Sequence, residues 1–267
     1  MRVAFVGAGQ IGAPMSERLL AAGHDVTVYA RRAEVREHFV AAGAAVTDSL
    51  ADAARAADVV HVCVYSDEQL ASVALDDNGL VAHLAGDALL VSHTTGSPAT
   101  IQRIAATGNG HVVDAPFSGS SLDVLAGTLT VMLGGAPDDV ERARTTVGAY
   151  ADPMRTIGAL GSALVVKLVN NALFAANIQL VAQAEQIANG LGVDTTTLAT
   201  VVQQSSGASY VMGLIAAMGS SASLIEAAGH YMRKDIDVVR EVTDDLGVDL
   251  GVLGLALDGG PARFTAK

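Results

Sequence analysis

Lys167 and Asn171 are the residues of this chain whose types and spacing point most directly to chemistry. They are four residues apart, so on a helix their side chains lie on one face, one turn from each other. A lysine beside a carbonyl oxygen can stabilise the charge that develops there and can give or take a proton. The pair is therefore a candidate polar site, although asparagines 170 and 171 also fit helix caps or satisfied core amides.

Two further polar segments lie where a fold does not need them for stability. The first, Asp114–Ser120, follows a short apolar strand, on the side of the sheet where doubly wound folds bind ligands. The second, Lys234-Asp235, lies on a helix late in the chain. A lysine there is, by itself, more often a side chain that extends along apolar surface to reach water.

A glycine motif near the N-terminus predicts a dinucleotide site. It follows a strand and opens an amphipathic helix, which is the context in which G-x-G-x-x-G binds a pyrophosphate. The three glycines allow a tight turn, a close approach of phosphate to backbone, and close packing of helix on strand. The helix N–H groups then face the phosphates. The residues assigned to the cofactor here are Gly7, Gly9, Gln10, Ile11 and Gly12.

The end of the second strand predicts which dinucleotide is bound. An enzyme that prefers NAD usually has an acidic residue there, which binds the ribose 2′-hydroxyl. This chain has Tyr29-Ala30-Arg31-Arg32, with no carboxylate. Because guanidinium groups bind a phosphate with two hydrogen bonds, Arg31 and Arg32 predict NADP(H) in preference to NAD(H). The competing interpretation is that both arginines are solvated loop residues.

Five motifs, taken in order, resemble the β-hydroxyacid dehydrogenase family and in particular its 3-hydroxyisobutyrate dehydrogenase-like members. They are the glycine motif with Pro14-Met15, Thr94-Thr95 with Pro98, Asp114–Gly119, Gly158–Asn171 and Lys234-Asp235. Together they span nearly the whole chain, which makes the set far more specific than any one motif. The resemblance implies an enzyme that interconverts a β-hydroxy acid, or another short-chain hydroxy acid, and its semialdehyde or keto form by hydride transfer.

The resemblance also implies roles for single residues. The residue matching Lys167 is the general acid/base, and the one matching Asn171 positions the substrate. Ser118 and Gly119, with Ser120 beside them, are expected to hold the substrate carboxylate. The predicted catalytic residues are thus Lys167, Asn171 and Ser118, and Thr95 and Lys234 are expected at the nicotinamide end of the cofactor.

Some positions depart from the family pattern. Ser120 stands where the family has a second glycine, and the bulky Phe117 precedes Ser118. Ser92 replaces a common aspartate, which we interpret as a structural difference. The helical half is also short between residues 208 and 231, where one wall of the substrate pocket is expected. The sequence therefore leaves the substrate open.

Two other functions are weighed against this one. Imine reductases share the two-domain plan but typically replace the catalytic lysine by an acidic or aromatic residue, so Lys167 argues against that function. A cofactor-binding sensor without turnover would need the fold alone, whereas this chain retains Lys167, Asn171 and Ser118 together.

The spacing of apolar segments predicts the elements that position these residues. Short strands alternate with helices in the first half, which is typical of an α/β Rossmann domain with a doubly wound, mostly parallel sheet. From about Ser162 only helices are expected. We therefore predict a Rossmann domain over residues 1–161 and an all-α C-terminal domain, for substrate binding and dimerisation, over 162–267. The expected strands are Val3–Val6, Val26–Tyr29, Val59–Val64, Leu89–Ser92, Val112–Asp114, Leu129–Leu133 and Met154–Ile157, and the expected later helices are Ala163–Asn189, Thr195–Gln204, Ile225–Leu246 (with a break considered at Gly229) and Val248–Leu257.

The first of these helices predicts self-association. Between Lys167 and Glu185 it carries no charge, so we expect protein to cover both of its faces. Because family members associate through the matching helix, the resemblance implies a homodimer or homotetramer through residues 163–189.

Composition excludes several partners. The net charge of −12 opposes binding to nucleic acid and to anionic membranes. The single cysteine, Cys63, lies in an apolar run and is expected in the core, which excludes an internal disulfide and a cysteine metal site, and no metal is expected. The stretch Leu168–Ala184 contains three Asn and two Gln, so no membrane span is expected. The chain starts directly with a strand, without a signal peptide, which predicts a cytoplasmic location.

Overall fold

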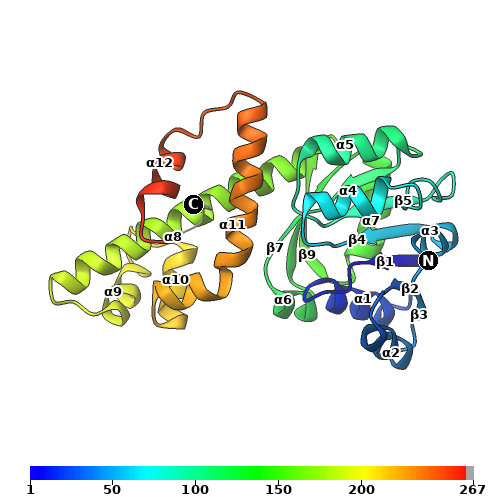
Figure 1. Ribbon diagram of the computed structural model, residues 1–267. Helices are drawn as coiled ribbons and strands as arrows, with labels where there is room; N and C mark the ends of the chain where they lie inside the picture. The colour runs from blue at the N-terminus through cyan, green and yellow to red at the C-terminus, as the bar shows by residue number, and fades with distance from the viewer. Residues whose placement is uncertain (263–267) are drawn as a thin grey trace. The chain divides into compact units, whose positions relative to one another are not determined.

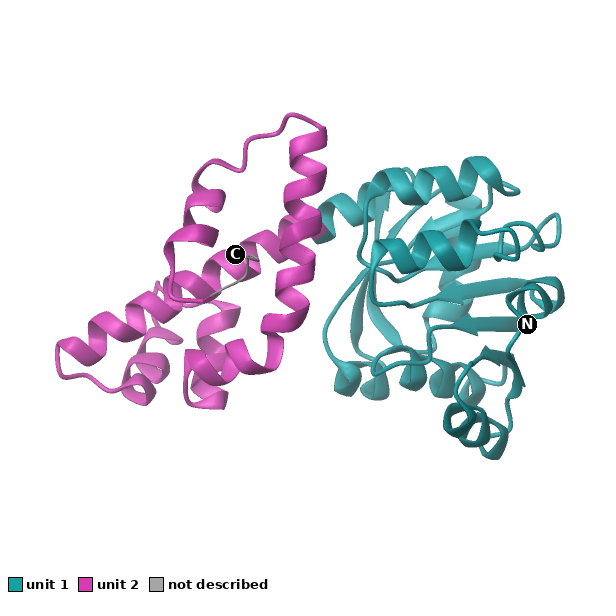
Figure 2. Cartoon of the chain, in the orientation of Figure 1, with its two compact units in different colours: residues 1–167 teal, residues 168–267 magenta. Residues whose placement is uncertain are grey.

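The chain, described over residues 1–262 in a computed structural model, forms two compact units. Unit 1 comprises residues 1–167 and unit 2 residues 168–267, and Figure 2 colours them separately. The boundary falls inside helix α8 (Ser162–Gly190), whereas the sequence analysis divides the chain just before this helix. Helix α8 therefore contributes its first turns to unit 1 and the rest to unit 2.

Unit 1 is built on one mostly parallel sheet with the strand order β3-β2-β1-β4-β5-β6-β8-β7, in which β9 also pairs with β8 (Figure 1). The strands from β3 to β6 are parallel, β8 is antiparallel to β6 and β7, and β9 is parallel to β8. This confirms the predicted Rossmann fold. The strands are β1 (Arg2–Val6), β2 (Asp25–Tyr29), β3 (Ala45–Thr47), β4 (Val59–Val62), β5 (Leu89–Ser92), β6 (Val112–Asp114), β7 (Phe117–Ser118), β8 (Leu129–Gly134) and β9 (Ala151–Gly158).

Successive strand residues enter two apolar clusters, one on each face of the sheet. In β1, Val3 and Phe5 belong to the first cluster, whereas Ala4 and Val6 belong to the second. Alternate side chains of a strand point to opposite faces, so strands that are covered on both faces are apolar throughout. Residues of α1 (Gly12–Ala21), α2 (Ala33–Ala41), α6 (Ser121–Ala126) and α7 (Pro137–Val147) complete the first cluster, and residues of α3 (Leu50–Ala56), α4 (Asp67–Leu75) and α5 (Pro98–Thr107) complete the second.

Serine side chains fix where three helices of unit 1 begin. Ser49, Ser66 and Ser97 each accept a hydrogen bond from a backbone N–H in the first turn of α3, α4 and α5. Ser97 is followed by Pro98 at the first helical position, as the sequence predicts. The start of α5 is thus fixed, and with it the loop that contains Thr95.

All seven predicted strands are present, and the structure adds two short ones. β3 has three residues and lies at the edge of the sheet, and β7 has two. β6 and β7 both pair with β8, and Ala115 and Pro116 separate them. Proline has no N–H to donate to a strand ladder, which explains the interruption. Ser118 therefore lies in a strand, opposite Thr130 of β8, rather than in a loop.

Unit 2 is helical in its described part. Its helices after α8 are α9 (Thr195–Val202), α10 (Tyr210–Met218), α11 (Ser221–Asp245) and α12 (Gly251–Gly259). The sequence does not predict α10, because its nearly all-apolar residues lack the alternating polar face of an amphipathic helix. The break considered at Gly229 is wrong: α11 passes through this residue, since a glycine lowers helix stability without ending the helix. The short segment 208–231 is thus largely helical.

Helix α8 is long and apolar enough to cross a membrane by length and composition alone. Half of its most apolar window is buried inside the chain, however. Leu168, Ala172 and Ile178 belong to the apolar core of unit 2, together with residues of α10 and α11. A core helix of a water-soluble protein passes the same test, and the packing of α8 is that of a core helix.

Candidate active site

The glycine motif forms a turn whose three glycines meet different surroundings. Gly7 has a φ of +100°, and a Cβ there would collide with the carbonyl of Cys63. A Cβ on Gly12 would collide with the carbonyl of Gly7. A Cβ on Gly9 would meet no protein atom within 4 Å. Protein packing therefore explains two of the glycines, and the open space beside Gly9 fits the predicted approach of a pyrophosphate to the backbone.

The same turn ends at the N-terminus of helix α1. Ile11 is the N-cap of α1 and provides no side-chain hydrogen bond, and Gln10 before it is exposed. The first N–H groups of a helix have no partner within the helix, so they can donate to an anion. The residues present thus fit the phosphates of a dinucleotide.

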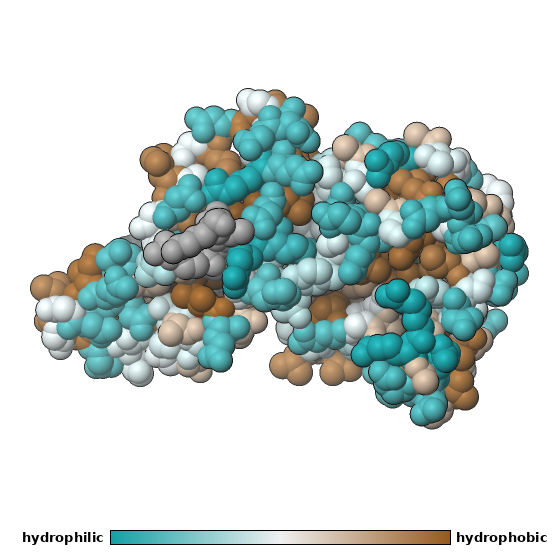
Figure 3. Space-filling view, viewed as in Figure 1, coloured by the Kyte–Doolittle hydropathy of each residue, from teal (hydrophilic) through white to brown (hydrophobic). Residues whose placement is uncertain are grey.

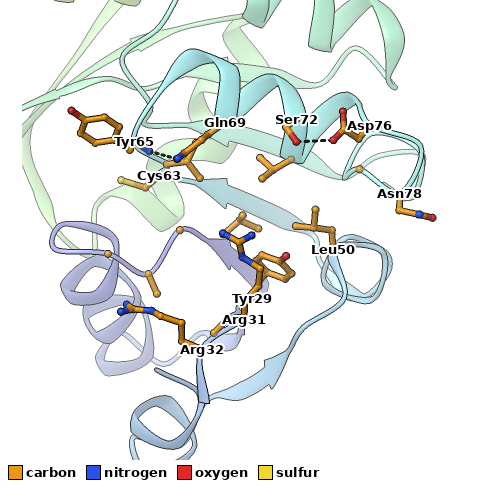
Figure 4. Close-up of a pocket in the computed structure, with 18 of the residues that line it drawn as sticks. Tyr29, Arg31, Arg32, Leu50, Cys63, Tyr65, Gln69, Ser72, Asp76 and Asn78 are labelled. Carbon is orange, nitrogen blue, oxygen red and sulfur yellow. Dashed lines mark hydrogen bonds between the residues drawn. The ribbon is translucent and has the colours of Figure 1, made fainter. Parts of the chain in front are cut away.

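A cavity of about 1180 Å³ lies beside this turn, within unit 1. Gly7 and Gly9 line one side, and residues of α4 line another, among them Gln69 and Ser72 (Figure 4). Cys63 also lines the cavity and is half-buried, so it lies at the edge of the core rather than inside it as expected. The volume and the position at the carboxyl ends of β1, β2 and β4 fit a nucleotide.

Arg31 and Arg32 line this cavity at the end of β2, and Figure 4 shows their guanidinium groups extending in different directions. Arg32 lies 3.5 Å from Glu34, but both side chains are 69% exposed, so the pair is weak. Arg36 was not predicted as a site residue. Its Nη1 donates to the carbonyls of Ala30 (3.1 Å) and Arg31 (2.8 Å) and thereby fixes the backbone that carries the two arginines.

The loop that contains Thr95 is held from helix α4. Asp67 accepts hydrogen bonds from the N–H of Ser97 (2.9 Å) and from the hydroxyl of Thr100 (2.5 Å). Thr94 is buried and accepts from the N–H of Val64 (3.1 Å). Thr95 itself is half-buried. The sequence analysis missed Asp67, which follows the capping residue of α4 and therefore looks like an ordinary first-turn acid.

Two histidines and a tyrosine form a buried cluster behind this loop. His93 Nδ1 donates to the carbonyl of Ala115 (2.8 Å), so His93 Nε2 accepts, and the hydroxyl of Tyr150 lies 2.9 Å from it. His61 Nδ1 lies 3.0 Å from His93 Nε2, and His61 Nε2 lies 2.9 Å from the hydroxyl of Thr146. Burial lowers the pKa of His93 to about 4 and the pKa of His61 well below its usual value. Both rings are therefore neutral at pH 7.

The predicted substrate segment turns sharply after Ser118. Gly119 has a φ of +136°, and a Cβ there would lie 2.9 Å from Leu129 Cδ1, so this position requires glycine. Ser120 is the N-cap of α6, and its N–H (2.7 Å) and hydroxyl (2.8 Å) both donate to Asp123. Ser118 and Phe117 are half-buried. The structure thus gives Ser120 a capping role that the sequence analysis did not assign to it.

Helix α8 carries Lys167 and Asn171 one turn apart, as predicted. Lys167 is half-buried, whereas Asn171 is only 1% exposed. Asn171 Nδ2 donates to Asp235 Oδ2 (2.6 Å), and Asn171 Oδ1 accepts from Asn170 (3.2 Å). One N–H of the Asn171 amide is therefore committed to Asp235, and the amide is held in a fixed orientation.

Asp235 links two predicted residues within unit 2. Its Oδ1 lies 2.8 Å from Lys234 Nζ, and the Lys234 side chain is 19% exposed. The sequence analysis names the pair Lys234-Asp235 but gives a role only to the lysine. An acidic residue on an otherwise apolar helix face was the available signal for Asp235.

Among residues 1–262, no group of three or more His, Cys, Asp or Glu side chains could hold a metal ion.

Comparisons with known proteins agree with this geometry. Residues 2–161 match the family model described as the NAD binding domain of 6-phosphogluconate dehydrogenase. Residues 161–258 match the model described as NAD-binding of NADP-dependent 3-hydroxyisobutyrate dehydrogenase. The chain is 34% identical over 216 residues to the NAD-dependent L-serine dehydrogenase of Pseudomonas aeruginosa. The matched region covers 79% of this chain and 72% of that protein.

Solved structures share the fold along nearly the whole chain. The 3-hydroxyisobutyrate dehydrogenase of Mycobacterium tuberculosis, solved with L-serine, has a TM-score of 0.86 and 26% identity. The matched region covers 96% of this chain and 91% of that chain. The imine reductase of Streptomyces aurantiacus has a TM-score of 0.67 and 19% identity, and the matched region covers 99% of this chain and 97% of that chain. The second likeness concerns the fold alone.

Proposed function

Because this chain belongs to the β-hydroxyacid dehydrogenase family, as a 3-hydroxyisobutyrate dehydrogenase-like and NAD(P)-dependent member, we propose that it acts on a β-hydroxy acid or another short-chain hydroxy acid. It oxidises this acid to its semialdehyde or keto form and catalyses the reverse reduction. The bound nicotinamide supplies or accepts the hydride. The two relatives whose names or structures include L-serine support this substrate class, since serine is itself a β-hydroxy acid.

Lys167 is the general acid/base of the proposed reaction. The observation that carries this role is its place on α8, half-buried and one turn before the fixed amide of Asn171. During reduction its ammonium group would stabilise the charge that develops on the carbonyl oxygen and donate the proton, and during oxidation the neutral amine would accept it. In the same proposal Asn171 orients the substrate, Ser118, Gly119 and Ser120 bind its carboxylate, and Thr95 and Lys234 contact the nicotinamide end of the cofactor.

Lys167→Ala tests the mechanism. We expect kcat to fall roughly 10²- to 10⁴-fold, as is typical when a general acid/base is removed, with little change in NADPH binding. The measurement is NADPH absorbance during turnover of a panel that contains 3-hydroxyisobutyrate and its semialdehyde, L-serine and a cyclic imine. Near-normal turnover by the variant would refute the assignment. Faster reduction of the imine than of any semialdehyde would favour an imine reductase, against which the lysine at position 167 argues.

NADP(H) is the proposed cofactor, rather than NAD(H). Support comes from Arg31, which lines the cavity and has no ion-pair partner among residues 1–262, and from the absence of a carboxylate over residues 29–32. The family includes a protein named as NAD-dependent, so family membership alone does not decide the question. Glu34, which pairs with Arg32, is the nearest feature that would favour a ribose hydroxyl.

Self-association through α8 is part of the same proposal. Val169, Leu173, Leu180 and Ile187 are each more than half exposed, on the helix that also supplies the core of unit 2. Brown apolar patches interrupt the polar surface on the visible face of the molecule as well (Figure 3). Burial of such side chains favours a homodimer or homotetramer. Light scattering that gives a monomer mass would contradict this.

A cytoplasmic location is likewise proposed, and cell fractionation tests it.

A further inference from the structure

Asp114 is a fully buried carboxylate at the end of β6. Its Oδ1 accepts from the N–H of Gly161 and its Oδ2 from the N–H of Leu164, both at 2.8 Å. Among residues 1–262 it has no ion-pair partner within 4.0 Å. Its charge is therefore balanced by backbone dipoles rather than by a cation.

The two N–H groups belong to the start of α8. Gly161 precedes the first residue of this helix and Leu164 lies in its first turn, where N–H groups lack partners and the helix dipole favours a negative charge. Neighbouring residues make room for the carboxylate: a Cβ on Gly134 of β8 would collide with Asp114 Oδ1. The start of α8 is thus capped from a strand that lies 47 residues earlier in the chain.

Burial and hydrogen bonding act on the pKa of this carboxyl group in opposite directions. Burial raises the pKa of Asp114 above its usual value, although the hydrogen bonds from Gly161 and Leu164 act in the opposite direction. When folding raises the pKa of a carboxyl group, the neutral form of the group stabilises the folded state. This contribution is complete below the pKa of the unfolded chain, near 3.8, and is lost as the pH rises through the pKa of the folded state.

Asp114 connects two parts of the proposed catalytic machinery. Ser118 lies four residues after it, in β7, and Lys167 lies three residues after Leu164, on the next turn of α8. We propose that Asp114 is a positioning residue that fixes the turn of α8 carrying Lys167 relative to the Ser118–Gly119 segment. This inference rests on the proposed function. Direct proton transfer by Asp114 is excluded, because the residue is 0% exposed and both of its oxygens accept backbone hydrogen bonds.

The test is Asp114→Asn. An amide keeps the shape of the carboxylate but presents an NH₂ group to one of the two backbone N–H donors, so one hydrogen bond is lost and the first turn of α8 shifts. We expect kcat to fall roughly 10- to 100-fold, since a displacement of about 1 Å has effects of this size. NADPH affinity should stay within about 2-fold. The primary isotope effect on kcat, measured with NADPH deuterated at the transferred position, should rise because hydride transfer becomes slower than the other steps.

Asp139→Asn is the matched control. Asp139 is also a buried carboxylate of unit 1, but its partners are His111 (3.0 Å) and Arg142 (3.2 Å), and none of the three is a proposed site residue. We expect this variant to lower thermal stability and to leave kcat and the isotope effect unchanged. An equal loss of kcat in both variants would mean that general destabilisation is the cause, and it would overturn the proposal.

A second variant covers the case in which Asp114→Asn does not fold. Gly134→Ala adds a methyl group that presses on Asp114 Oδ1 while the carboxylate keeps its charge. It should also lower kcat and raise the isotope effect, and unchanged values in whichever variant folds would overturn the proposal. Lys167→Ala is assayed in parallel. If that variant keeps its turnover, the proposed function fails, whereas an inactive Lys167→Ala beside a fully active Asp114→Asn overturns only the role of Asp114.

Discussion

Asp114 in unit 1 and Asn171 in unit 2 are buried polar side chains that are held in different ways. In unit 1, Asp114 binds backbone N–H groups and His93 binds a backbone carbonyl, at the ends of β6 and β5. In unit 2, Asn171 binds the side chain of Asp235, 64 residues further along the chain. Asp114 therefore depends on backbone groups at the start of a helix, whereas Asn171 depends on one distant side chain. Both arrangements join residues that lie far apart in the sequence, so no local pattern reports either of them.

The glycine turn offers the largest test of this difference. Gly7→Ala should lower the free energy of unfolding by about 4 kcal/mol, because the residue has a positive φ and its new methyl group would collide with the carbonyl of Cys63. Urea denaturation measures the change. Unit 2, which holds none of these atoms, should keep its protection in hydrogen exchange at urea concentrations that open unit 1 of the variant.

Gly9→Ala is the matched variant in the same turn. Its methyl group would meet no protein atom within 4 Å, so the free energy of unfolding should stay within about 0.5 kcal/mol. NADPH affinity should nevertheless fall roughly 10-fold or more, because the methyl group occupies the path of the pyrophosphate. Equal stability losses in both variants would contradict the division of roles among the glycines.

Acid should also separate the two units. His61 and His93 are fully buried in unit 1, whereas the one histidine in the described part of unit 2, His230, is exposed. Burial holds the pKa of His93 at about 4, so the folded state lacks a proton that the unfolded chain binds below pH 6.5. The stabilising contribution is complete above pH 6.5 and is lost as the pH falls towards 4, by roughly 3 kcal/mol for His93 alone.

Urea denaturation at several pH values between 7 and 4 measures this loss. His93→Gln removes the titrating ring but can still donate to the carbonyl of Ala115, so its stability should depend less steeply on pH. Hydrogen exchange at pH 4.5 should show unit 1 opening before unit 2. The opposite order would break the comparison.

The smallest expected effect concerns the cofactor. Arg31→Ala should raise the KM for NADPH roughly 10-fold, or about 1.4 kcal/mol, through loss of a contact to the 2′-phosphate, and should leave the KM for NADH unchanged. Steady-state kinetics with both cofactors measures the change. Because Arg31 is not among the proposed catalytic residues, kcat at saturating NADPH should not move. An NADH constant equal to or better than that for NADPH in the wild type would refute the preference itself.

The sequence predicts the fold of unit 1 almost strand by strand, because strands covered on both faces are apolar runs between turns. Two short strands escape, since two or three residues carry no periodic pattern. In unit 2 the helix α10 escapes because it is apolar all round. The site follows the same rule: Gly7, Gly9 and Lys167 come from motifs with fixed local spacing, whereas Asp67 and the link from Asp235 to Asn171 arise from tertiary contacts that no local pattern encodes.

The carbonyl that forces position 7 to be glycine belongs to the only cysteine of the chain. Cys63 lines the nucleotide cavity, so its sulfur is a built-in chemical probe of that space. A thiol reagent can modify one residue at most, and a single added mass reports the whole reaction. Slower alkylation in the presence of a dinucleotide would measure occupancy directly, without a label, a substrate or turnover.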